Sequence, residues 1–118
     1  MFQATRAVFY YAISPVHMGA GSAIGAIDSP IQREVHTGHP MFAGAGLKGA
    51  LRHHLNAAWP KDNERPNPLI ARMFGPDTRA SDFAGAIAIS DAQLVALPVR
   101  SLKGGFAYAT SPVAQQQT

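Results

Sequence analysis

The chain has 118 residues, a length typical of one domain or less. Hydrophobic residues make up 47% of it, but many are alanine, so only a thin core is expected, and 11 glycines with 9 prolines indicate many turns. Cysteine is absent, which excludes disulfides, thiolate zinc sites and thiol nucleophiles and favours a cytoplasmic location. The net charge of +3 is by itself weak evidence for a nucleic-acid partner.

One long uncharged stretch resembles a membrane span in length. Residues 7–27 contain no Asp, Glu, Lys or Arg. Pro15, His17 and three glycines interrupt the stretch, and no clear cleavage site follows its short apolar part. We therefore expect neither a membrane helix nor a signal peptide.

The first half of the chain predicts a strand, a long loop and a helix. Residues 7–13 are aromatic, β-branched and uncharged, which is typical of a central strand. Residues 14–46 are rich in Gly and Pro and are expected to be irregular. Residues 47–59 predict a helix, because leucines recur at helical spacing, whereas Lys48, Arg52 and Asn56 define a separate polar face.

The second half predicts a shorter helix and three strands. A helix over residues 68–74 would have Asn67 as its cap, Pro68 in its first turn and Gly75 as its stop. After a polar loop at 76–82, strands are expected at 83–89, 95–99 and 106–110, with a turn at 103–105. This order predicts an α+β fold rather than a doubly wound sheet.

A glycine-rich segment opens the predicted helix at 47–59. Residues 44–49 match the pattern G-x-G-x-x-G, but neither a preceding buried strand nor a suitably spaced acid supports a dinucleotide site. Two interpretations remain. Backbone N–H groups at the helix start, with Lys48 and Arg52 on the next turns, form a phosphate-binding arrangement. Alternatively, the segment is an ordinary helix start with exposed basic residues.

Three further features carry candidate chemistry in the long loop. Gly21 and Ser22 lie in a flexible stretch that allows close approach of an RNA backbone or another subunit, or simply needs a positive φ. Asp28 is the only acid in the first 33 residues and serves either as a general base or metal ligand, or as a turn cap before Pro30. His17 is either a proton shuttle or a hydrogen-bonded loop residue.

Histidine pairs raise the question of a zinc site. His36 and His39 span a Gly-Pro loop, and the adjacent His53 and His54 point apart on a helix. Without cysteine to support either pair, we expect no zinc site.

Several motifs together resemble the RAMP superfamily of CRISPR proteins, in particular the repeated backbone subunit of type III-B (Cmr) effector complexes. The resemblance runs from about residue 6 to 113. Its most specific pieces are Asp-x-Pro-Ile-x-Arg-Glu at 28–34 and Leu-Lys-Gly-x-Leu-Arg at 47–52, supported by the segments 14–22, 36–40, 73–75, 85–92, 98–101 and 106–112.

The resemblance implies a ferredoxin-like, RRM-related α+β fold with long glycine-rich insertions, present here as one partial domain over residues 1–118. It also implies subunits that stack along a guide RNA, associate with other CRISPR effector subunits and with themselves, and cleave the paired target RNA. That cleavage would need a divalent metal ion, Mg²⁺ or Mn²⁺, and would use the 2′-OH of the RNA.

Site roles follow from the same resemblance. Asp28 takes the catalytic position and also that of the metal ligand, and His17 has a supporting catalytic role. The residues expected to bind RNA lie in the glycine-rich segments and the first helix: Gly21, Ser22, Arg33, Gly44, Gly46, Lys48, Gly49 and Arg52.

The chain departs from the family pattern in two ways. It reads Ala-Gly-Ala-Gly at 43–46 where the family commonly has Pro-Gly-Ser-Ser, so weaker guide binding is expected. It is also less than half as long as family members, which predicts exposed sheet edges that invite pairing with another chain. Two alternatives stay open: a non-catalytic RNA-binding or assembly module, and, less favoured, a nucleotide-binding enzyme.

Overall fold

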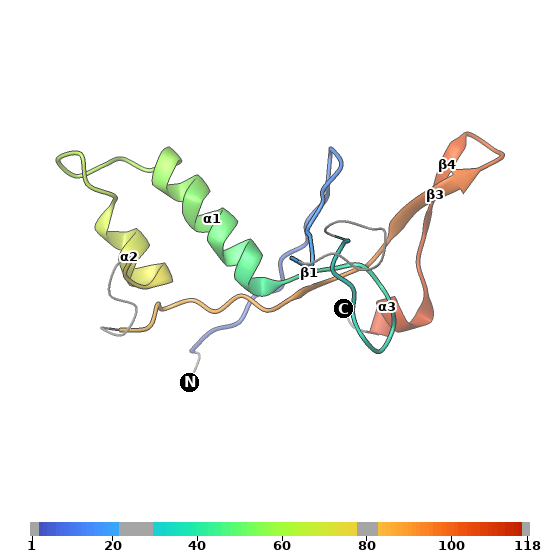
Figure 1. The fold of residues 1–118 in the computed structure, drawn as a ribbon, viewed down its shortest axis with the longest axis horizontal. Coiled ribbons are helices and arrows are strands. Elements are labelled where there is room, and N and C mark those ends of the chain that lie inside the picture. Colours follow the sequence, from blue (N-terminus) through green and yellow to red (C-terminus); the bar gives the residue numbers. More distant parts are fainter. Residues whose placement is uncertain (1–2, 22–29, 78–82, 117–118) are drawn as a thin grey trace. The chain divides into compact units, whose positions relative to one another are not determined.

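The structure is a computed structural model that describes residues 3–21, 30–77 and 83–116. The chain divides into two compact units, Met1–Ile31 and Gln32–Thr118. The helices and strands of the described residues all lie in the second unit (Figure 1): β1 (Met41–Phe42), α1 (Gly44–Ala58), α2 (Pro68–Phe74), β2 (Ala92–Gln93), β3 (Leu97–Ser101), β4 (Gly105–Ala109) and α3 (Pro112–Gln116). This mixture of helices and antiparallel strands confirms the α+β class.

The predicted helix at 47–59 is present as α1, but it begins earlier, at Gly44. Leu47, Leu51 and Leu55 form its half-buried stripe, as the spacing predicts. At the other end, the N–H of Trp59 donates to the carbonyl of Leu55 at 2.9 Å and Pro60 follows, so the helix cannot continue.

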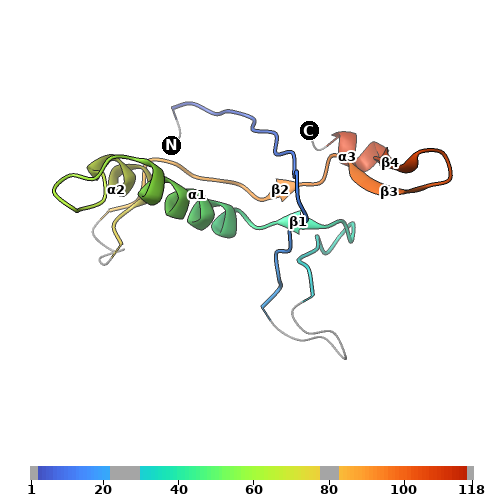
Figure 2. The same cartoon turned by 90° about the horizontal axis from the view of Figure 1, so that it is seen from above.

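The predicted helix at 68–74 is confirmed together with its start and stop signals. In α2 the side chain of Asn67 accepts a hydrogen bond from the N–H of Leu69 at 3.0 Å, and Pro68 occupies the first turn. Gly75 ends the helix with a φ of 93°. Ile70 and Phe74 are buried, and α1 packs beside α2 (Figure 2).

The predicted turn at 103–105 joins two strands, β3 and β4, which form an antiparallel hairpin. Ser101 pairs with Gly105, and Gly104 and Gly105 both have a φ of 84°, which explains why this turn needs glycine. The hydroxyl of Ser101 accepts a hydrogen bond from the N–H of Lys103 at 3.2 Å. The strands begin and end within about two residues of the predicted ranges.

The strand prediction for residues 7–13 is wrong for this structure, because no strand of the described part of the chain pairs with them. Their apolar side chains stay in solvent: Phe9 is 74% exposed and Ile13 is 91% exposed. Apolarity and β-propensity describe a segment suited to a sheet, but a strand exists only when a neighbour accepts its hydrogen bonds.

The strand prediction for residues 83–89 is also wrong, although the period-two pattern is there. Gly85, Ile87 and Ile89 are half-buried and alternate with exposed residues. Instead of joining a ladder, the N–H groups of Ala86 and Ile87 donate to the carbonyls at the C-terminal end of α2, at 2.9 and 3.0 Å. The segment therefore satisfies the orphan carbonyls of a helix end rather than the edge of a sheet.

The described sheets contain two strands each: β1 pairs with β2, and β3 pairs with β4. The ferredoxin-like sheet and the single partial domain over residues 1–118 stay predictions. Within the residues described, no helix combines the length and the apolarity needed to cross a membrane.

Candidate nucleic-acid interface

The glycines of α1 occupy two different environments. Gly44 is buried, and a Cβ atom there would lie 2.2 Å from the carbonyl oxygen of Ile89, so the segment at 89–90 passes directly over it. Gly46 and Gly49 are exposed, and a Cβ atom at Gly49 would meet no atom within 4 Å. The first glycine is thus needed for packing inside the chain, whereas the other two face solvent.

The N-terminus of α1 is capped from far along the sequence. The carboxylate of Asp91 accepts a hydrogen bond from the N–H of Gly44 at 2.8 Å. Ala43, at the N-cap position, provides no side-chain cap, and the first turn contains no acid. Asp91 therefore satisfies an otherwise orphan donor and places negative charge at the positive end of the helix dipole.

The predicted polar face of α1 turns toward the protein rather than toward solvent. The ammonium group of Lys48 donates to the carbonyl of Ile87 at 3.1 Å. Arg52 forms an ion pair with Asp77, with Nη2 and Oδ1 2.6 Å apart, and the arginine side chain is only 20% exposed. The structure thus brings Lys48 and Arg52 together on one half-buried side of α1, each with a partner in the chain. Their role as RNA contacts stays a prediction.

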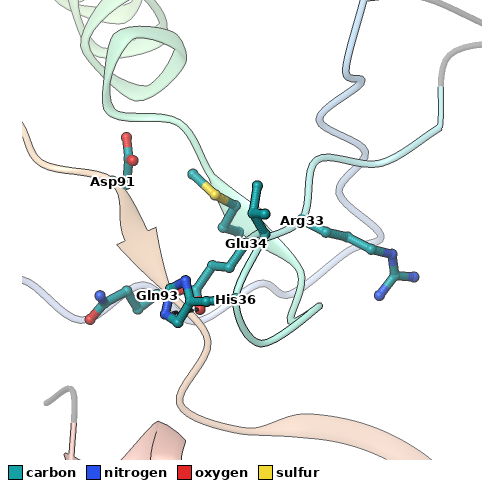
Figure 3. A pocket seen from close by; sticks show the side chains of 7 residues that line it. Arg33, Glu34, His36, Asp91 and Gln93 are labelled. Carbon is teal, nitrogen blue, oxygen red and sulfur yellow. Dashed lines mark ion pairs between the residues drawn. The ribbon is translucent and has the colours of Figure 1, made fainter.

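A tight turn at residues 34–38 places Arg33 beside an open pocket of ≈ 320 Å³. The pocket is lined by Arg33, Glu34, Val35, His36, Met41, Asp91 and Gln93. Glu34 is buried; its carboxylate accepts a hydrogen bond from the hydroxyl of Thr37 at 2.6 Å and lies 3.6 Å from Nε2 of His36. In Figure 3 the guanidinium of Arg33 points away from both. It donates to the carbonyl of Gly38 and is exposed.

The first unit holds the other predicted site residues. His17 is exposed, and Gly21 has a φ of 86° with open space around it, so a glycine is needed there for backbone conformation. Gly19 pairs with Ile31, and the N–H of Ala20 donates to the carbonyl of Pro30 at 2.7 Å. This bridge joins the two ends of the segment that contains Ser22 and Asp28, which themselves lie outside the described residues.

The polar residues that sequence reasoning missed are Asp91 and Glu34. Both belong to motifs that were matched to the family as a whole, yet no local spacing marks either one for its role. Asp91 acts across 47 positions of sequence. The residues described contain no group of three or more His, Asp or Glu side chains that could hold a metal ion.

The cap supplied by Asp91 gives a first testable prediction. Asp91→Ala should lower the free energy of unfolding by about 1 kcal/mol, the usual cost of losing an N-cap acceptor. Asp91→Asn keeps an acceptor oxygen but loses the charge, so its effect should be smaller. Urea denaturation followed by circular dichroism measures both. Equal stability of Asp91→Ala and the parent chain would contradict this role of Asp91.

Comparison with known proteins agrees with the resemblance. A model of the RAMP superfamily matches residues 9–116. The CRISPR system Cmr endoribonuclease Cmr4 of Pyrococcus furiosus is 46% identical over 104 residues, which cover 87% of this chain and 34% of that protein.

Solved structures give the same picture. The crystal structure of oligomeric Cmr4 from Pyrococcus furiosus matches 91% of this chain and 35% of its own, with a TM-score of 0.68 and 40% identity. The cryo-EM structure of the type III-B Cmr-beta bound to cognate target RNA contains a chain that matches with a TM-score of 0.69 and 28% identity, over 86% of this chain and 36% of its own. The chain therefore spans about a third of the length of these relatives. Its match to the family model over nearly all of its residues means that the chain belongs to the RAMP superfamily.

Proposed function

We propose that this chain is part of a backbone subunit of a type III CRISPR effector complex. It would bind the guide RNA along its sugar-phosphate backbone and cleave the complementary target RNA. Membership of the RAMP superfamily supports this proposal, as do a similar protein named a Cmr endoribonuclease and a similar chain in a complex bound to target RNA.

The exposed glycines of α1 are the observation that carries the RNA-binding part. Glycine inside an exposed helix costs about 1 kcal/mol relative to alanine, and at Gly49 no neighbouring atom requires it. Such a cost is expected where another backbone must come close to the helix. A strand of RNA lying against Gly46 and Gly49 would meet the exposed side of the N-terminal part of α1.

The other predicted contacts complete this proposed interface. Arg33 presents an exposed guanidinium, whereas Lys48 and Arg52 would exchange their partners in the chain for RNA phosphates. The buried Gly44 supports the surface by admitting the segment at 89–90. In the first unit, Gly21 and Ser22 would let RNA or another subunit approach.

Asp28 and His17 carry the cleavage part of the proposal. The carboxylate of Asp28 would accept the proton of a target 2′-OH, whose oxygen attacks the adjacent phosphorus. The bond to the 5′ oxygen then breaks, and His17 would donate a proton to that leaving oxygen. The products would be a 2′,3′-cyclic phosphate and a 5′-hydroxyl.

A divalent metal ion stays part of the proposal, and Asp28 would be its ligand from this chain. The described residues do not fit a metal site built by protein alone, because they offer no group of three His, Asp or Glu side chains. The steps above therefore use only Asp28, His17 and the RNA. Dependence of cleavage on Mg²⁺ or Mn²⁺, and its loss in EDTA, tests this part separately.

The proposed fold of the assembled subunit is ferredoxin-like and RRM-related, and its proposed location is the cytoplasm. A neighbouring segment or chain would cover the apolar side chains of residues 7–13. The exposure of Phe9 and Ile13 supports this contact. Other effector subunits and further copies of this chain are the proposed partners.

A non-catalytic assembly module is the second candidate, and the exposed apolar segment favours it. Five large side chains between Val8 and Ile13 are more than half exposed, as expected of a surface that awaits another chain: Val8, Phe9, Tyr10, Tyr11 and Ile13. Binding of guide and target without any cleavage product, in the presence of Mg²⁺, would favour this candidate.

Filling the exposed face of α1 tests the RNA-binding part. Gly49→Leu should weaken binding of guide RNA about tenfold, the cost of losing one charge-assisted hydrogen bond, because the side chain holds the RNA away from the helix. The same substitution should not destabilise the chain, since leucine is a better helix former than glycine. Fluorescence anisotropy with labelled guide RNA measures affinity, and thermal unfolding measures stability.

The matched control for this test is Ala57→Leu, which adds leucine to an exposed position near the other end of α1. Its affinity for RNA should equal that of the parent chain. Unchanged affinity of Gly49→Leu for guide RNA would contradict RNA binding at α1. An affinity that does not change with salt concentration would contradict contacts with the phosphate backbone.

A further inference from the structure

The β3–β4 hairpin carries an exposed aromatic face that the proposed function does not use. Phe106 lies directly opposite Arg100 and Tyr108 directly opposite Pro98, so these four side chains share one face of the hairpin. We call them the hairpin platform. The rings of Phe106 and Tyr108 have centroids 5.7 Å apart and planes at 89°. They are 58% and 55% exposed.

The two neighbouring aromatic rings form an exposed patch on the hairpin. A single two-stranded hairpin is marginally stable at best in water, and here every residue of β4 is exposed. An exposed aromatic patch of this kind marks a contact surface, and the charge around it distinguishes between the possible occupants.

The charge around the platform indicates the chemistry of that ligand. From Leu97 to Ala109 the chain contains Arg100 and Lys103 and no acidic residue. Arg100 belongs to the platform itself, and Lys103 lies in the adjoining turn. The opposite face of the hairpin, with Leu97 and Val99, carries no charge. Aromatic faces with adjacent cations are the combination that binds single-stranded nucleic acids, through base stacking and phosphate contacts.

The angle between the two rings indicates whether the platform suits a single strand or a duplex. Successive bases in a duplex are nearly parallel, so a continuous stack cannot lie on two perpendicular rings. Bases of an unpaired strand can splay apart and stack on each ring separately. The geometry favours single-stranded RNA over a duplex.

We infer that the hairpin platform binds unpaired bases of an RNA strand. Phe106 and Tyr108 stack on separate bases, and Arg100 and Lys103 neutralise the neighbouring phosphates. This inference rests on the proposed function in taking RNA as the ligand, but its surface is separate in sequence from α1. The positive charge of the platform favours RNA over a protein partner, since a cationic aromatic surface without acidic residues is complementary to a polyanion.

The test uses the 118-residue chain and a fluorescein-labelled oligouridine of about 20 nucleotides, which cannot pair with itself. The double substitution Phe106→Ala/Tyr108→Ala should raise the Kd at least about tenfold, since each stacked base contributes on the order of 1–3 kcal/mol. The slope of log K against log salt should not change. By contrast, Arg100→Gln should reduce the slope by about 0.7, the value for one phosphate contact on a single strand.

Two controls separate stacking from general damage to the hairpin. Leu102→Ala removes an apolar side chain that is fully exposed at the turn of the same hairpin, and it should leave the Kd unchanged. Phe106→Trp/Tyr108→Trp keeps two stacking rings and should retain most of the affinity even if the double alanine variant loses the hairpin. Ultraviolet cross-linking of oligo-4-thiouridine to the parent chain, mapped by mass spectrometry, should label Phe106 or Tyr108.

The possible outcomes distinguish failure of the proposed function from failure of the inference about the hairpin platform. If the parent chain binds no RNA, the proposed function and this inference both fail. If it binds RNA but the alanine variant binds equally and no label maps to β4, only the inference fails. If the alanine variant keeps its RNA affinity and instead loses self-association in light scattering, the platform is a protein contact and the inference is wrong.

Discussion

Asp28→Asn is expected to slow cleavage of target RNA strongly while guide RNA stays bound. The substitution keeps the size and shape of the side chain but removes the carboxylate that would accept the 2′-OH proton. General-base catalysis typically contributes about 10²–10⁴-fold in rate, and a loss of that order is expected here. Single-turnover cleavage by a complex reconstituted with guide RNA measures the rate, and anisotropy measures guide affinity.

A matched acid elsewhere in the chain controls for a general change of charge. Asp62 lies in an exposed turn, where its backbone pairs with that of Arg65. Asp62→Asn should cleave at the parent rate. Equal cleavage by Asp28→Asn would end the catalytic assignment, and the absence of cleavage in the parent complex would favour the assembly module.

Gly44→Ala and Gly85→Ala are expected to have the largest effects on stability. A Cβ atom at Gly44 would lie 2.2 Å from the carbonyl oxygen of Ile89, and one at Gly85 would lie 2.4 Å from that of Met73. In both cases the obstacle is backbone, which cannot rotate away as a side chain would. Overpacking of this kind costs about 1–3 kcal/mol or more. Urea denaturation followed by circular dichroism measures the loss.

Gly49→Ala is the matched control, because it adds the same methyl group to α1 in open space. It should raise the free energy of unfolding by up to about 1 kcal/mol. The two α1 variants thus differ in sign, although they lie on the same helix. Parent-like stability of Gly44→Ala would mean that the segment at 89–90 does not cross the helix as described.

Elements with complete local signals were predictable from sequence. The helix α2 carries its cap, its first-turn proline and its terminal glycine within nine residues, and all three act as expected. The hairpin likewise depends on a turn whose glycines adopt positive φ. In both cases the determining contacts lie between neighbours in the chain, where spacing alone is informative.

Features that depend on distant residues were not predictable. The strands expected at 7–13 and 83–89 have the right composition, but pairing requires a partner that composition does not identify. The start of α1 was placed too late because its cap, Asp91, lies 47 positions away. Glycine has a low helix propensity, and the remote carboxylate stabilises the turn that these glycines begin.

The candidate site was predictable as a set of residue types and not as an arrangement. Sequence identified the glycines and cations of α1, yet it did not distinguish the buried Gly44 from the exposed Gly49. Periodicity defined Lys48 and Arg52 as one face correctly. One of the two interpretations left these basic residues exposed, whereas an ion pair with Asp77 and a carbonyl acceptor hold them against the chain.

The bond between Asp91 and Gly44 also joins a helix to a sheet. Asp91 directly precedes β2, and Ala43 alone separates β1 from α1. The β1–β2 ladder and the helix cap are therefore formed by the same two segments, 41–44 and 91–93. Fraying of this ladder is therefore expected to accompany unwinding of the first turn of α1. A ligand that binds at the start of α1 would therefore also stabilise the β1–β2 ladder, in which Met41 pairs with Gln93.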